Sequence, residues 1–153
     1  MTTWDLIIAL VYHVDEQLRA IPKHPEAHLW PSEVVTLGLL HALKGVGNRA
    51  FHRWLTRDYQ PLFPRLPERT RLFRLLKTHQ DWTQIFLASP TVQAVARSRL
   101  LVCHMKKVMH RGWAYFQACL AFTMAAFNVL VRWHGLRPTA SGFVPLSIAE
   151  FGY

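Results

Sequence analysis

The chain has 153 residues, a length that suits one domain burying about two thirds of its unfolded surface. A hydrophobic content of 51% excludes a disordered tail, and a charged content of only 18% is low for a fully solvated surface, so part of that surface is expected to need a partner. The 18 Lys and Arg exceed the 9 Asp and Glu, and the net charge of +9 favours nucleic acid as the partner, with an anionic membrane second.

Two apolar helices are predicted in the first third of the chain. The first covers Trp4 to Ile21 and ends where Pro22 breaks the pattern. The second lies in PSEVVTLGLLHALKGVG, with Ser32 as its N-cap and with Gly45 and Gly47 as its exit. Their apolar stripes consist of Leu6, Leu10, Val14, Leu18 and Ile21 in the first helix and of Val34, Val35, Leu37, Leu40 and Leu43 in the second.

Two basic amphipathic helices follow. The third predicted helix, NRAFHRWLTRDY, opens with Asn48 as its cap. In the fourth helix, Pro67 occupies the first turn and Glu68 lies favourably near the N-terminus. The apolar faces are Phe51, Trp54 and Leu55 in the third helix and Leu72, Leu75, Leu76 and His79 in the fourth.

A long apolar helix is predicted near the C-terminus. The span 113–131 contains 19 residues without a charge, which is long enough for a membrane helix. However, Gln117 and Asn128 lie on one side of this helix and basic residues flank both of its ends, so a buried or interface helix is favoured. No alternating strand pattern or internal repeat occurs in the sequence. The predicted fold class is therefore all-α, with an N-terminal helical bundle and one long C-terminal helix.

The sequence also predicts a reducing compartment. Cys103 and Cys119 would lie about 24 Å apart on one continuous helix, which is too far for a disulfide. The N-terminal stretch carries Asp5 directly before its apolar run and is a poor signal peptide. A cytoplasmic location is expected.

A cluster of basic residues lies in the middle of the chain. Between Lys44 and Lys77 there are nine Lys or Arg and two acids, a net charge of +7. Arginines that repeat at every helical turn suit the phosphates of a duplex, and two short helices joined by a glycine turn resemble a helix-turn-helix. The alternative is an ordinary solvated surface. The candidate DNA contacts are Lys44, Arg49, Arg53, Arg57, Arg65, Arg69, Arg71, Arg74 and Lys77, together with Lys106, Lys107 and Arg111 at the basic front end of the helical stretch 100–135.

Other candidate sites are weaker. His24 and His28 have the i, i+4 spacing of metal ligands, but two prolines disrupt the helix that this spacing needs. Cys103 and His104 would point about 100° apart on a helix. The single G-x-G in KGVGNR is typical of a helix exit rather than of a phosphate loop. No catalytic or metal site is predicted from these residues.

Two stretches resemble bacterial insertion-sequence transposases of the DDE superfamily. SEVVTLGLLHALKGVGNRAFHRWL and LPERTRLFRLL are similar to the helical region that precedes the catalytic domain in one such group. VCHMKKVMHRGWAYFQACLAFTMAAFNVLVRWHGL is similar to the helix that closes that domain. The resemblance implies a DNA-contacting region at residues 1–95 and a tail of the catalytic domain at residues 96–153.

The sequence departs from this family where the catalytic acids belong. The resemblance implies an RNase H-like domain that holds two Asp and one Glu around divalent metal ions. From Trp82 to Ala149, however, 68 consecutive residues include no acid, and Gln93 is the only residue of similar shape where the Glu is expected. The simplest interpretation is an internally deleted transposase, joined near residues 96–99, that lacks the RNase H-like sheet, the metal cofactor and activity. Its C-terminal helix is expected to be detached.

Two alternative functions stay open at this point. One is a small DNA-binding regulator, which competes with an intact transposase for DNA ends or forms mixed oligomers with it. The other is a small basic membrane protein. If the chain is a transposase remnant or a DNA-binding regulator, DNA is its partner. In both cases the C-terminal helix is expected to mediate self-association or assembly with a full-length transposase.

Overall fold

The described part of the chain is built from helices. The structure, a computed structural model, describes residues 2–87, 113–133, 135 and 140. No strand occurs within these residues, which confirms the predicted all-α class. The predicted boundary at residues 95 and 96 lies outside them. The α-helices are α1 (Thr3–Leu18), α2 (Pro31–Lys44), α3 (Asn48–Asp58), α4 (Arg69–Thr78), α5 (Gln84–Leu87) and α8 (Trp113–Trp133), and the 3-10 helices are η1 (Gln60–Leu62) and η2 (Gln80–Thr83).

Helix α1 begins with a capping box. The Thr2 hydroxyl accepts the backbone N–H of Asp5 at 3.2 Å, and the Asp5 carboxylate accepts the backbone N–H of Thr2 at 2.9 Å. Hydrogen bonds from the side chain and backbone of Thr2 lower the pKa of Asp5. The helix ends at Leu18, earlier than the predicted Ile21, because the N–H of Ile21 turns back to the carbonyl of Leu18 ahead of Pro22.

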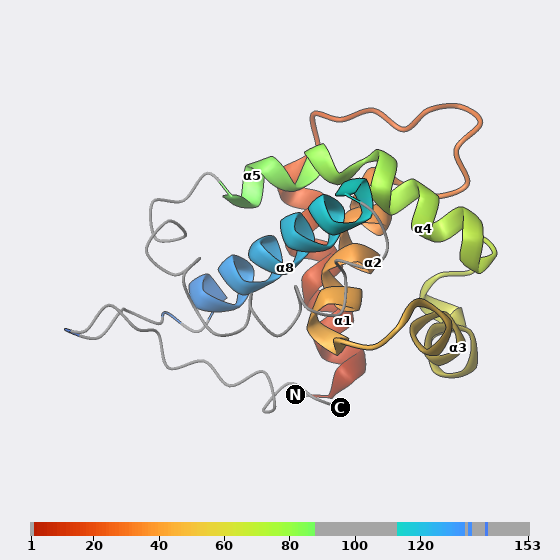
Figure 1. Cartoon of the computed structure of the whole chain (residues 1–153), viewed down its shortest axis with the longest axis horizontal. Coiled ribbons are helices and arrows are strands. Elements are labelled where there is room, and N and C mark those ends of the chain that lie inside the picture. Colours follow the sequence, from red (N-terminus) through yellow and green to blue (C-terminus); the bar gives the residue numbers. More distant parts are fainter. Residues whose placement is uncertain (1, 88–112, 134, 136–139, 141–153) are drawn as a thin grey trace.

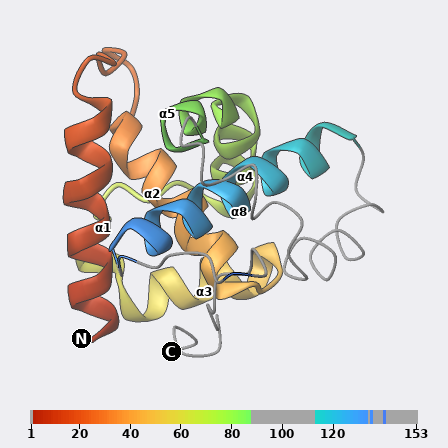
Figure 2. The same cartoon turned by 90° about the vertical axis from the view of Figure 1, so that its left-hand side faces the viewer.

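Helix α2 forms the centre of the bundle. It begins at Pro31, so its N-cap is Trp30 rather than the predicted Ser32, and the Glu33 carboxylate accepts the N–H of Trp30 at 2.7 Å. It ends at Lys44, and Gly45, the predicted exit, caps it in the left-handed conformation at φ +63°. Helix α1 packs on one side of α2 and α8 on another, so that nearly all of its side chains are buried (Figure 2).

Helices α3 and α4 have the predicted faces but different starting residues. The N-cap of α3 is Gly47 rather than Asn48, whose side-chain oxygen accepts the hydroxyl of Tyr115 on α8 at 2.6 Å. Pro67 lies ahead of α4, and Glu68 is the N-cap of that helix. The buried residues on the predicted apolar faces are Phe51, Leu55, Leu72 and Leu76.

The C-terminal helix packs against the N-terminal helices. Helix α8 packs against α2, α5 and η2 and lies across α2 in Figure 1, so the expectation of a detached helix is wrong. At the crossing with α2, a Cβ atom on Gly38 would overlap the ring of Phe122, so only glycine permits this approach. The buried Asn128 side chain donates a hydrogen bond to the carbonyl of Phe86 at 2.5 Å. Helix α8 therefore completes the same core that α1 and α2 begin.

The other face of α8 is only partly covered. Ala118 and Ala125 are buried in the bundle, whereas Leu120 and Phe127 are half-buried. The segment Ala114–Trp133 is long and apolar enough to cross a membrane. However, half of its most apolar stretch of 18 residues is buried inside the structure. A core helix meets the same criteria of length and composition.

Candidate nucleic-acid interface

Three arginines form a row along the exposed side of α3. Arg49, Arg53 and Arg57 follow one another at intervals of about one helical turn, and all three are exposed. On the opposite side of α3, Phe51 and Leu55 are fully buried in the core. The residues that anchor α3 to the core therefore determine the direction in which the arginines point.

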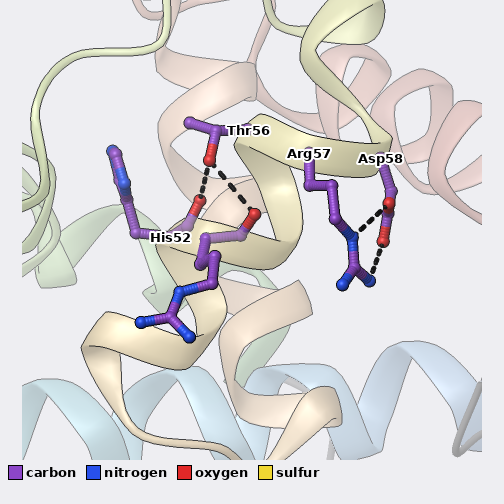
Figure 3. Close-up of polar contacts among 5 residues, drawn as sticks. His52, Thr56, Arg57 and Asp58 are labelled. Atoms are coloured by element: carbon purple, nitrogen blue, oxygen red, sulfur yellow. Dashed lines mark hydrogen bonds and ion pairs between the residues drawn. The ribbon is translucent and has the colours of Figure 1, made fainter.

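A side-chain contact joins α3 to the start of α4. The Nε2 atom of His52 lies 2.9 Å from the carbonyl oxygen of Pro67. Because a carbonyl oxygen can only accept, Nε2 carries the proton and donates it. On the same turn, the Thr56 hydroxyl donates to the carbonyl of His52 at 2.9 Å (Figure 3). The contact between His52 and Pro67 holds α3 next to the segment that leads into α4.

The structure brings three of the predicted DNA contacts together around one open hollow. Arg49 and Arg53 from α3 and Arg69 from α4 line it, together with Gly47, Asn48 and Ala50. The N–H groups in the first turn of any helix lack helical partners, and no side chain caps those of α3. None of the lining residues is acidic. Cationic forks beside a helix N-terminus favour a phosphate group.

Two of the predicted contacts are engaged within the protein. The guanidinium of Arg57 donates two hydrogen bonds of 2.7 Å to the carboxylate of Asp58 (Figure 3). These bonds lower the pKa of Asp58 and raise that of Arg57, so both groups stay charged and largely neutralise each other. The Lys44 ammonium lies 5.0 Å from the centre of the Trp54 ring, a cation–π contact.

The remaining predicted contacts lie away from the hollow. Arg65 and Arg74 are exposed. Arg71 lines a different pocket, which also includes His79, and Lys77 lines a small cavity next to α8. Lys106, Lys107 and Arg111 lie outside the described residues. The basic surface is therefore made of one cluster with several separate charges around it.

Sequence reasoning missed the contribution of the α3 N-terminus. Asn48 was predicted as a cap, but it is the first residue of α3, its side-chain oxygen accepts the Tyr115 hydroxyl, and no side chain caps the helix. The signal that was available is Gly47, a residue without a capping side chain directly before a basic helix. Within the described residues, no three His, Cys, Asp or Glu side chains are arranged so that they could hold a metal ion, and this applies to His24 and His28 as well.

Comparison with known proteins adds no relative. No family model, curated protein or solved structure matches the chain.

Proposed function

We propose that the chain is a catalytically inactive, DNA-binding remnant of an insertion-sequence transposase. The observation that carries the DNA-binding part is the hollow at the α3 N-terminus, where Arg49, Arg53 and Arg69 converge without an acid. The assignment to the transposase superfamily rests on the sequence resemblance alone. A net charge of +9 supports a polyanionic partner.

The hollow suits the backbone of a duplex rather than the edges of its bases. Guanidinium forks bind phosphate oxygens in pairs, and the open N–H groups at a helix N-terminus add further donors. Contacts of this kind position a protein on DNA and carry no sequence information by themselves. The glycine turn between α2 and α3 is compatible with a helix-turn-helix, in which α3 is the recognition helix.

A small regulator of an intact transposase is the second candidate. It requires the same DNA surface and, in addition, a face for mixed oligomers, for which the half-buried side of α8 is suited. The proposal of a small membrane protein has less support, because half of the most apolar stretch of α8 is already buried, as in a core helix. Binding that is specific for the ends of an element favours the regulator.

A salt titration tests the DNA-binding proposal. Fluorescence anisotropy of a labelled duplex is measured with the purified protein at a series of NaCl concentrations. Log K is expected to fall linearly with log salt, with a slope of about −0.9 for each phosphate contacted. If the protein fails to bind duplex DNA even at low salt, the proposal is wrong.

Cleavage of DNA is expected to be absent. The run of 68 residues without an acid lacks the carboxylates that the resemblance would place there around paired divalent metal ions. Incubation of the protein with Mg²⁺ or Mn²⁺ and with DNA that carries the ends of the element is therefore expected to give neither nicks nor joined products. Asp81, an exposed residue of η2, is the last acid before this run. Metal-dependent cleavage that disappears in Asp81→Asn would contradict the proposal.

Self-association is expected through the outward face of α8. Leu120 and Phe127 leave apolar surface in water, and burial of a few hundred Å² recovers several kcal/mol at about 25 cal/mol per Å². Sedimentation at tens of micromolar is expected to show dimers or larger species. A Leu120→Gln, Phe127→Gln double variant should sediment as a smaller species, with the exposed Gln117→Ala as the matched control. A wild-type monomer at these concentrations would contradict the expectation.

A further inference from the structure

A second, more enclosed pocket lies between the α1–α2 loop with the start of α2 and the segment that runs from Pro67 through α4 into η2. The loop passes beside α4 at the edge of the bundle (Figure 1). His24 and His28 come from the loop, Arg71 and Leu75 from α4, and His79 and Trp82 from the segment that follows it.

The size of this pocket suits one ring. Its volume is about 140 Å³, whereas sites for cofactors and drug-sized ligands usually measure about 300–1,000 Å³. An apolar cavity of about 150 Å³ is sufficient for benzene. The pocket therefore has about the room of a single aromatic ring, and a small group attached to that ring would lie at the pocket's open edge, where His24, His28 and Arg71 are exposed.

The walls favour a planar and apolar body. The rings of His79 and Trp82 stack with their centroids 4.0 Å apart and an interplanar angle of 14°. Because the two rings face each other, the flat surface that the pair can offer a ligand is one outer ring face. Leu75 adds an aliphatic contact. An aromatic ring that enters the pocket gains contact with the His79–Trp82 pair and with Leu75.

The polar groups of the pocket favour an anion. Three imidazoles and the guanidinium of Arg71 line it, and none of the lining residues is acidic. The Nδ1 atom of His24 accepts the backbone N–H of Glu26 at 3.3 Å, so the proton of the neutral ring is on Nε2, which is a donor. Arg71 is a permanent cation with a fork of donors that fits a carboxylate or a phosphate.

We propose that this pocket binds a small aromatic anion, a single planar ring that carries a carboxylate or a phosphate group. The ring lies against the His79–Trp82 pair, and the anionic group is bound by Arg71 and the loop histidines. Arg71 is also one of the predicted DNA contacts. A bound anion therefore removes one cation from the DNA-binding surface and weakens DNA binding, a consequence that rests on the proposed function.

A titration without DNA tests the pocket directly. Benzoate is added to ¹⁵N-labelled protein, and the indole N–H signal of Trp82 is followed by NMR. Benzoate is expected to shift this signal in a saturable way, whereas neutral benzamide and ring-free acetate should bind at least about tenfold more weakly, because each lacks one of the two features. Phenyl phosphate in place of benzoate shows which anionic group is preferred. Equal responses to benzoate, benzamide and acetate would overturn the proposal.

Loop variants keep the test independent of the core. Trp82 is partly buried against the core, so its replacement risks unfolding. His24 and His28 are exposed loop residues, and the His24→Ala, His28→Ala double variant is expected to weaken benzoate binding about tenfold. Gln84→Ala, an exposed residue outside the pocket, is the control and should bind benzoate as the wild type does. Unchanged affinity in the double variant would show that the loop does not form the site.

The effect on DNA is measured separately. Duplex affinity is compared in benzoate and in acetate at the same ionic strength, and it is expected to fall severalfold in benzoate, since one phosphate contact is lost. Equal affinities in the two salts would overturn the coupling through Arg71. If the duplex does not bind even in acetate, the proposed function is wrong, whereas the pocket is judged by the NMR titration alone.

Discussion

Replacement of Arg49, Arg53, Arg57, Arg71 and Arg74 together by Ala is expected to remove most of the affinity for duplex DNA. Asp58 already pairs with Arg57, so four arginines remain to neutralise one phosphate each, and the slope of log K against log salt becomes shallower by up to about 3.6. A fourfold rise in salt then costs the wild type up to about 150-fold more affinity than it costs the variant. All five side chains are exposed, so the variant should keep its fold, and circular dichroism checks this.

Matched variants separate position from net charge. Arg19 and Arg132 are exposed and lie outside the predicted contacts, and their replacement by Ala should change the slope less than an equal number of changes on α3. Within α3, Arg53→Ala should have a larger effect than Arg57→Ala, because Asp58 already neutralises Arg57. If the fivefold variant keeps both affinity and slope, the basic cluster is an ordinary solvated surface.

Substitutions where α2 and α8 cross are expected to have the largest effect on the free energy of unfolding. Phe122 is 4% exposed and lies against Gly38, so Phe122→Ala removes buried contacts and leaves a cavity. Truncations of this kind typically cost about 3–5 kcal/mol in the free energy of unfolding. Urea denaturation, followed by circular dichroism, measures the loss.

The effect of Gly38→Ala on the free energy of unfolding is expected to change sign when the residue at position 122 is changed. In the wild type, the new methyl group overlaps the Phe122 ring, and such overpacking typically costs about 1–3 kcal/mol. In the Phe122→Ala background the overlap is removed, and alanine gains about 0.5–1 kcal/mol over glycine inside a helix. A double-mutant cycle by urea denaturation reveals this coupling. Additive effects of the two changes would contradict the observed packing.

Much of the helical architecture follows from local patterns. In α4, Leu72 and Leu76 are buried and Arg71 and Arg74 are exposed, as the 3.6-residue period predicts. The contact of α8 with α2 has no such local signal. It depends on Gly38, because the ring of Phe122 occupies the space that a side chain at position 38 would need. From the sequence alone, a glycine inside a helix only indicates lower helix stability.

The candidate site was predictable residue by residue but not as an arrangement. The exposure of the α3 arginines follows from helical spacing, whereas the position of Arg69 beside them depends on how α3 and α4 pack. The hydrogen bond from His52 to Pro67 joins those two regions, and no pattern in the sequence reports it. For the same reason, Arg71 was assigned to the DNA surface, although it also lines a pocket with residues from a distant loop.

The order of synthesis gives the packing of α8 on α2 a kinetic consequence. The N-terminal helices leave the ribosome first, but the face of α2 around Gly38 has no cover until α8 is made. At about 5–20 residues per second, that interval lasts on the order of 5–20 s. During this time the nascent chain exposes apolar surface that α8 later buries. A chaperone that binds apolar segments would therefore compete with α8 for the same face, and the yield of folded protein would depend on which of the two arrives first.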